Sequence, residues 1–264
     1  MREKKYKSIP INATIFCIVC GLVAMFGVYW IFNYLLYPKL NLNLSKAMLD
    51  SISYIILYCI GFPLLYLFIR NIPKQNIEIK KSIEIKSLFK ILIVQCGISV
   101  LIMFIVSLAL NSCTSNSYPT FINIRDPYEM IKLLIIAPVL EELVFRKVLL
   151  DRLRPYGNLK SILISSLFFS IPHFVSQGIP QIFYTLILGC IWAYVMNKTG
   201  KIKYTIFLHG FSNLWAGIIP MILLKSSAGS LLYFVLWIII IPMISILIII
   251  FNRSIITDIL YDKR

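Results

Sequence analysis

Charged side chains are scarce in this sequence, at 14% of its 264 residues, whereas 59% of the residues are apolar. Soluble globular domains have about a quarter charged residues and about half apolar ones. With a mean hydropathy of +0.85, the chain leaves no room for a sizeable soluble domain. We therefore predict a single integral membrane domain over residues 1–264, with almost all of the chain needed for membrane spans.

Acidic residues are rare as well: 11 Asp and Glu stand against 26 Lys and Arg, which gives a net charge of +15. A basic chain can bind nucleic acid, but here most positive residues fall in short segments between apolar runs. In such loops they set the orientation of the spans and contact anionic lipid headgroups. The distribution favours membrane lipids as partners and argues against nucleic acid.

The six cysteines do not have the spacing of a disulfide framework. Five of them lie inside apolar runs, where a free cysteine behaves as a small buried hydrophobe. Cys17 and Cys20 form a C-x-x-C, but no second pair accompanies it, as a zinc site of that type requires. We predict no redox or metal site at the cysteines.

Long apolar runs make up most of the sequence. A helix needs about 20 apolar residues to cross the bilayer, and eight candidates occur. If the N-terminus is cytoplasmic, most Lys and Arg lie on the inner side, which favours an even number of spans with both termini cytoplasmic. We therefore predict an all-α polytopic membrane helix bundle. The eight spans are expected near residues 11–36, 48–69, 88–110, 128–150, 160–178, 180–197, 203–224 and 229–252.

Only a few ionisable groups lie deep inside these runs. Among the acids these are Glu141 and Glu142, and both histidines of the chain, His173 and His209, also fall within predicted spans. Ionisable groups in lipid are costly, face the interior of the bundle and find one another, so they mark a functional site by default.

The spacing within the spans adds detail. Glu142 and Arg146 are four residues apart, on one face of a helix and in the better order for an ion pair. Glu141 lies on a different face of the same helix from Arg146 and has no partner there, which suits a general base. The four-residue spacing recurs on two further helices, between Phe169 and His173 and between His209 and Asn213.

Each of these pairs has a plain structural interpretation when taken alone. A buried ion pair can be structural, and a histidine in a membrane helix is often a hydrogen-bonding contact between helices. Together, however, the pairs supply a base, a second base or acid, a carboxamide donor and a cation. That assortment favours hydrolysis of an amide over packing.

Three motifs appear in order on separate spans: EExxxR at residues 141–146, FxxxH at 169–173 and HxxxN at 209–213. Their order resembles the CPBP family, which comprises type II CAAX prenyl proteases and bacteriocin-processing, Abi-like proteins. The resemblance covers about residues 128–224, the expected protease core. It implies a CPBP-type intramembrane glutamic endopeptidase that cleaves a peptide or a lipidated or membrane-anchored protein.

The resemblance also implies roles for the residues. Glu141 and His173 are expected to activate a water for attack on the scissile carbonyl, while His209 and Asn213 stabilise the oxyanion. The residues expected to support this site are Glu142, Arg146 and Phe169.

A zinc metalloendopeptidase is the first alternative, with Glu141, His173 and His209 as three ligands and a water in the open position. The sequence lacks HExxH, and asparagine is a poor zinc ligand, so we favour a mechanism without a cofactor. The second alternative is a non-catalytic relative, a bacteriocin self-immunity or scaffold protein. A transporter is disfavoured because we find no inverted repeat.

The composition, rich in Ile, Lys and Asn, suggests a bacterial origin. We expect the chain in a bacterial cell membrane, with its active site opening to the cytoplasm and bacteriocin or peptide-precursor processing as its role.

Overall fold

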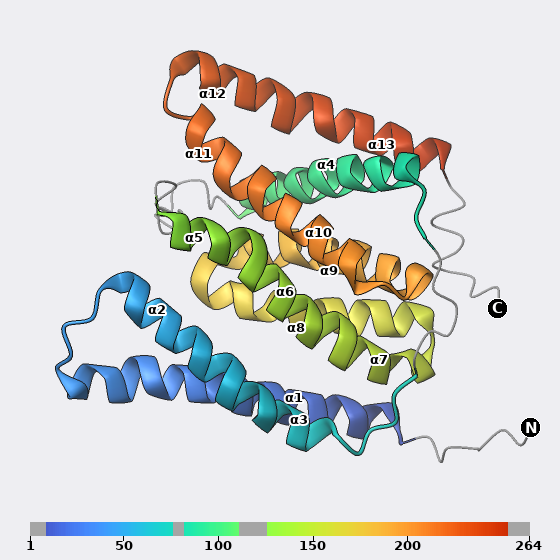
Figure 1. Cartoon of the computed structure of the whole chain (residues 1–264). Coiled ribbons are helices and arrows are strands. Elements are labelled where there is room, and N and C mark those ends of the chain that lie inside the picture. The colour runs from blue at the N-terminus through green and yellow to red at the C-terminus, as the bar shows by residue number, and fades with distance from the viewer. Residues whose placement is uncertain (1–8, 76–81, 111–125, 253–264) are drawn as a thin grey trace, which may run out of the picture. The chain divides into compact units, whose positions relative to one another are not determined.

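The computed structural model describes residues 9–75, 82–110 and 126–252, and these form helices and no strand (Figure 1). The predicted all-α class is therefore confirmed for this part of the chain. In lipid a helix is favoured because it satisfies its own backbone N–H and C=O groups within one segment. Both chain ends, residues 1–8 and 253–264, lie outside the described ranges, so their cytoplasmic placement stays a prediction.

Six helical segments of the described chain are long and apolar enough to cross a membrane. Each overlaps a predicted span, with ends that differ by a few residues. The other two predicted spans, 128–150 and 160–178, are also helical but carry the acidic, basic and polar residues discussed below. The number eight thus stays a prediction. The six segments are Ile11–Leu40, Lys46–Ile69, Ile85–Ala109, Ile179–Thr199, Ile202–Leu223 and Ser227–Phe251.

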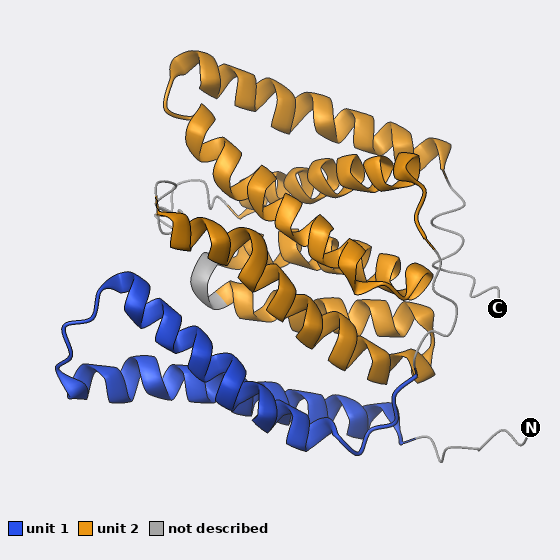
Figure 2. Ribbon diagram, in the orientation of Figure 1, with its two compact units in different colours: residues 1–75 blue, residues 76–264 orange. Residues whose placement is uncertain are grey.

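The chain divides into two compact units, residues 1–75 and 76–264 (Figure 2). The prediction of a single domain is not tested by this division and stays a prediction. Within the first unit, α1 packs on η3 and α3. Gly21 and Gly61 allow the close approach, because a Cβ atom at either position would lie 2.7 Å from an atom of the facing helix. The elements of this unit are α1 (Ile11–Trp30), η1 (Ile31–Leu36), η2 (Tyr37–Leu40), α2 (Lys46–Ile55), η3 (Ile56–Gly61) and α3 (Phe62–Ile69).

The second unit holds all of the predicted site residues. In it α8 and α9 form a hairpin, α4 packs on α9 and on α13, and α10 packs on α6, η5 and α9. Its elements are α4 (Ile85–Ala109), α5 (Pro127–Ile131), η5 (Lys132–Ile136), α6 (Ala137–Glu142), η6 (Leu143–Leu149), α7 (Leu150–Leu153), η7 (Arg154–Tyr156), α8 (Asn158–Gln177), α9 (Ile179–Thr199), α10 (Ile202–Asn213), η8 (Leu214–Ile218), α11 (Ile219–Leu223), α12 (Ser227–Tyr233), η9 (Phe234–Ile240) and α13 (Ile241–Phe251).

A polar network fixes the turn between η7 and α8. Gly157 adopts φ +103°, a value that glycine tolerates best, and so lets the chain reverse. Arg154 pairs with the buried Asp151 and donates from Nε to Asn197 Oδ1 on α9 at 2.8 Å. Asn197 in turn donates from Nδ2 to Asn158 Oδ1 at the start of α8. The helical run from residue 127 to residue 156 is thereby tied to the α8–α9 hairpin.

Candidate active site

The EExxxR motif lies where α6 passes into η6, a π-helical stretch. Glu142 Oε2 lies 3.3 Å from Arg146 Nε, and both side chains are fully buried. This is the ion pair that the four-residue spacing predicts. Arg146 Nη1 contacts Ser165 Oγ on α8 at 3.4 Å, and that hydroxyl donates to the carbonyl of Phe145 at 3.0 Å. The guanidinium is thus held between η6 and α8.

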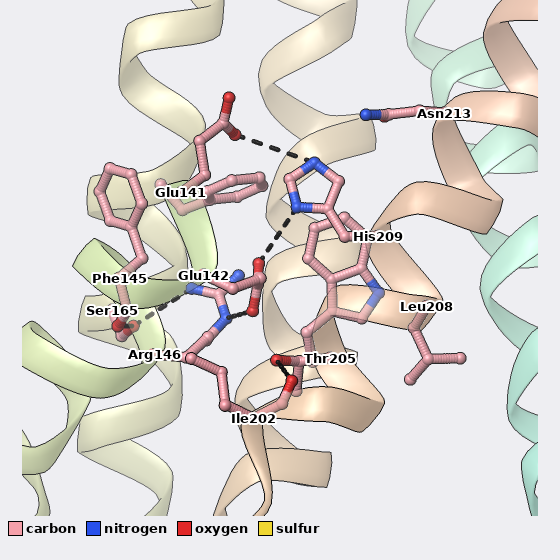
Figure 3. A network of polar contacts seen from close by, with 12 residues as sticks. Glu141, Glu142, Phe145, Arg146, Ser165, Ile202, Thr205, Leu208, His209 and Asn213 are labelled. Atoms are coloured by element: carbon pink, nitrogen blue, oxygen red, sulfur yellow. Dashed lines mark hydrogen bonds and ion pairs between the residues drawn. The ribbon is translucent and has the colours of Figure 1, made fainter. Parts of the chain in front are cut away.

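His209 of α10 lies between the two glutamates (Figure 3). Its Nδ1 atom lies 3.3 Å from Glu142 Oε1, and its Nε2 atom lies 3.8 Å from Glu141 Oε2. The Glu141 side chain is 21% exposed, whereas the His209 side chain is 5% exposed. The two adjacent carboxylates therefore differ: that of Glu142 is fully buried in an ion pair, and that of Glu141 is partly exposed.

Close packing of α10 brings this imidazole to the glutamates. A Cβ atom at Gly210 would lie 2.7 Å from the backbone oxygen of Leu134, so only a glycine allows the two backbones to approach this far. One turn further on, Asn213 Nδ2 donates to the backbone oxygen of Leu133 at 2.9 Å. An asparagine NH₂ group has two hydrogens, so a second N–H is left for another acceptor.

Aromatic rings form the wall around the imidazoles. The Phe169 ring lies 5.0 Å from the ring of His173, 5.7 Å from that of His209 and 4.8 Å from the Arg146 guanidinium, measured to ring centroids. The Trp192 indole stacks on His209 at 4.3 Å with an interplanar angle of 23°. These contacts restrict the orientation of His209 beyond what its two carboxylate neighbours impose.

His173 approaches the same centre from α8. Its Nδ1 atom lies 3.0 Å from the backbone oxygen of Phe169, one turn earlier. The Phe169 ring contacts both imidazoles, at 5.0 Å from the His173 ring and 5.7 Å from the His209 ring, and so places His173 near the same centre. The structure therefore brings Glu141, Glu142, His173 and His209 together, from three helical segments that are distant in sequence.

The metal alternative can be compared with this geometry. Within the ranges 9–75, 82–110 and 126–252, no three His, Cys, Asp or Glu side chains lie where they would hold one metal ion. In His173 one ring nitrogen is bound to a backbone carbonyl, and in His209 both ring nitrogens face carboxylates. Glu141, His173 and His209 do not form a three-ligand site in this arrangement, and we derive no step through a metal.

Two residues of the site were not found from the sequence. Trp192 stacks on His209, and Gln95 of α4 accepts a hydrogen bond from the Trp192 indole at 2.9 Å. An aromatic residue in a membrane span gives no distinctive signal. Gln95, however, is an amide in the middle of an apolar run, so the rule that singled out the buried acids and histidines applies to it equally.

Comparisons with known proteins agree with the motif pattern. Residues 124–215 match the family model described as type II CAAX prenyl endopeptidase Rce1-like. Neither the curated proteins nor the solved structures gave a match. The matched range contains all three motifs and the residues that form the buried cluster. Over residues 124–215 the chain is therefore similar to the Rce1-like type II CAAX prenyl endopeptidases, the membrane protease family that the three motifs resemble.

Proposed function

We propose that this protein is an intramembrane endopeptidase in which Glu141 is the general base for hydrolysis of a peptide bond. The observation that carries the proposal is the contrast between the two adjacent glutamates. Glu142 is fully buried and pairs with Arg146, whereas Glu141 is partly exposed and faces His209 Nε2 at 3.8 Å. A separation of this size is beyond a direct hydrogen bond but suits one water that contacts both groups.

In the proposed reaction, Glu141 accepts a proton from that water while the water oxygen attacks the scissile carbonyl carbon. The new C–O bond gives a tetrahedral intermediate with a negative oxygen. As the C–N bond breaks, the proton held by Glu141 passes to the leaving nitrogen, so the products are one carboxylic acid and one amine. His173, whose Nδ1 atom is held by the backbone oxygen of Phe169, is proposed to assist in orienting the water through its other ring nitrogen.

His209 and Asn213 are proposed to stabilise the negative oxygen. Glu142 pairs with Arg146, and in the proposed reaction His209 acts as an imidazolium. An imidazolium donates from both ring nitrogens. Its Nδ1–H is directed to Glu142, which leaves Nε2–H for the oxyanion. The second N–H of Asn213 supplies a further donor.

The location of the site and the similarity to the protease family support a proposal for the substrate class. The glutamates, the histidines and Asn213 are carried by helices of a strongly apolar chain. We propose a peptide or a lipidated or membrane-anchored protein as the substrate, cleaved in a bacterial cell membrane at a site that opens to the cytoplasm. Processing of a bacteriocin or another peptide precursor is the corresponding role.

The test is comparative peptidomics of membranes that contain the wild-type protein, a Glu141→Gln variant or no copy of the protein. A cleavage product seen only with the wild-type protein supports the proposal, and purified protein in liposomes should then cleave the identified substrate. If Glu141→Gln folds, inserts and still gives the product, Glu141 is not the base. If the variant keeps the phenotype while no product forms with either protein, a binding or immunity role replaces hydrolysis.

A further inference from the structure

The helix α4 lies outside the range that matches the protease family, yet it reaches the candidate site through one side chain. Gln95 is completely buried. Its Oε1 atom accepts a hydrogen bond from Trp192 Nε1 at 2.9 Å, and its Nε2 atom donates to the backbone oxygen of Leu208 at 3.0 Å. One amide thus bridges α9 and α10.

The orientation of this amide is fixed by chemistry. An indole N–H only donates and a backbone carbonyl only accepts, so the amide oxygen must face Trp192 and the amide nitrogen must face Leu208. The amide satisfies two buried polar groups at once, and such satisfied networks in a low-dielectric interior rigidify their surroundings. Gln95 therefore holds α9 and α10 in one defined relationship.

Both contacts end next to His209. Leu208 is its preceding residue, so the bond to the Leu208 carbonyl restrains the backbone of α10 at the imidazole. Trp192 carries the ring that stacks on His209, with centroids 4.3 Å apart. His209 in turn must keep Nδ1 toward Glu142 and Nε2 toward Glu141. A rotation of Trp192 or a shift of α10 would displace Nε2 from its place opposite Glu141.

We propose that Gln95 is a positioning residue of the site: it locks Trp192 and the α10 backbone so that the His209 imidazole stays between the two glutamates. The kinetic part of this inference rests on the proposed function. The structural part, the restraint on Trp192 and His209, does not.

The variant for the test is Gln95→Met, which keeps the length of the side chain but removes both hydrogen bonds. A matched control is Ser245→Ala on α13. Ser245 Oγ lies 2.7 Å from the backbone oxygens of both Ile93 on α4 and Ile241 on its own helix. This change therefore also removes a hydrogen-bonding group next to α4, two residues from Gln95, without touching Trp192. Thermal unfolding in detergent establishes that both variants fold.

The first readout needs no substrate. The chain has four tryptophans, and labelling with 5-fluorotryptophan gives four fluorine NMR signals, of which Trp192→Phe identifies the one from Trp192. The signal of Trp192 should respond to His209→Gln, because the two rings are stacked. We expect it to move in Gln95→Met and to stay unchanged in Ser245→Ala. An unchanged Trp192 signal in Gln95→Met overturns the inference.

The second readout is kinetic. We expect kcat to fall by about 10- to 100-fold in Gln95→Met with KM unchanged, because small displacements of a catalytic group have effects of this size. In a Trp192→Phe background, which keeps an aromatic ring but lacks the indole N–H, Gln95→Met should lower kcat clearly less. Equal losses in both backgrounds, or an equal loss in Ser245→Ala, contradict positioning through Trp192. If the Trp192 signal moves as expected but no preparation of the wild-type protein cleaves any peptide, the restraint stands and the proposed function fails.

Discussion

Glu142 and Arg146 form an ion pair whose two side chains have no exposed surface, and the carboxylate of the pair also contacts His209. Removing one partner of such a pair leaves the other charge buried without compensation, which typically costs about 3–5 kcal/mol. Arg146→Ala should therefore lower the free energy of unfolding by this order, or prevent stable insertion. Thermal unfolding in detergent and the yield of membrane-inserted protein measure the effect.

The neighbouring residue supplies the control for that variant. Lys147 is also a cation that pairs with an acid, with Nζ 2.9 Å from Asp151 Oδ2, but its side chain is 48% exposed. Exposed pairs contribute about 0–1 kcal/mol. Lys147→Ala should thus leave stability nearly unchanged, and a loss as large as that of Arg146→Ala would show that burial of the Glu142 charge is not the cause.

The two glutamates should separate activity from stability. Glu141→Gln removes the proposed base from a partly exposed position and leaves the buried Glu142–Arg146 pair intact, so we expect cleavage to be abolished while the unfolding temperature stays near the wild-type value. Glu142→Gln weakens the charge pairing of the buried Arg146 and should lower the unfolding temperature. Cleavage of a reporter peptide in liposomes, with calorimetry of the same preparations, compares them. Residual cleavage by Glu141→Gln at the wild-type rate would disprove its role as base.

The sequence allowed the local parts of this site to be predicted, because helical periodicity places residues four apart on one face. The Glu142–Arg146 ion pair and the contact of Phe169 with His173 are both of this kind. The long-range contact of His209 with both glutamates was foreseen only in general terms, since buried ionisable groups seek one another in lipid.

The contribution of α4 was not foreseen, for a physical reason. Gln95 acts on the site through Trp192, and the contact depends on how α4, α9 and α10 pack, which no spacing within one helix encodes. The helix ends differ by a few residues from the predicted span ends, because contacts between side chains can extend a helix beyond its apolar run. Helical elements run on without a break from residue 127 to residue 156, past the expected end at residue 150, because Asp151 and Arg154 form a buried polar network there.

Asn213 tests the oxyanion assignment. Asn213→Ala removes a carboxamide donor, and loss of one oxyanion donor typically lowers kcat by about 10²–10³-fold. We expect this loss with KM unchanged, since the donor acts mainly on charge that develops in the transition state. Asn213→Asp, which keeps the size but has no N–H to donate when ionised, should be equally impaired. Steady-state kinetics on the substrate found by peptidomics decide the matter, and a normal rate in Asn213→Ala rules the assignment out.

Metal dependence separates the two forms of the protease. In the proposed mechanism, Glu141 and the imidazoles act without a cofactor, so dialysis against a strong chelator should leave the rate unchanged. The metalloendopeptidase alternative with Glu141, His173 and His209 as ligands predicts loss of activity in chelator and recovery on addition of zinc. Metal analysis of the purified, active protein provides an independent measurement, and stoichiometric zinc that tracks with activity would favour the alternative.

The close approach of α10 to η5 offers a final test of how the site is assembled. A Cβ atom at Gly210 would lie 2.7 Å from the backbone oxygen of Leu134, so Gly210→Ala forces the helices apart, and overpacking of this kind costs about 1–3 kcal/mol. Because His209 precedes this residue and Asn213 follows within a turn, we expect cleavage to fall along with stability.

Gly217→Ala is the matched control, since a Cβ atom there meets only a side-chain carbon of Leu133 at an ordinary 3.7 Å. Replacing a helical glycine by alanine is otherwise favourable by roughly 0.5–1 kcal/mol. Gly217→Ala should therefore be neutral or slightly stabilising and fully active. Equal behaviour of the two variants in unfolding and cleavage assays would mean that the approach at Gly210 does not set the position of His209.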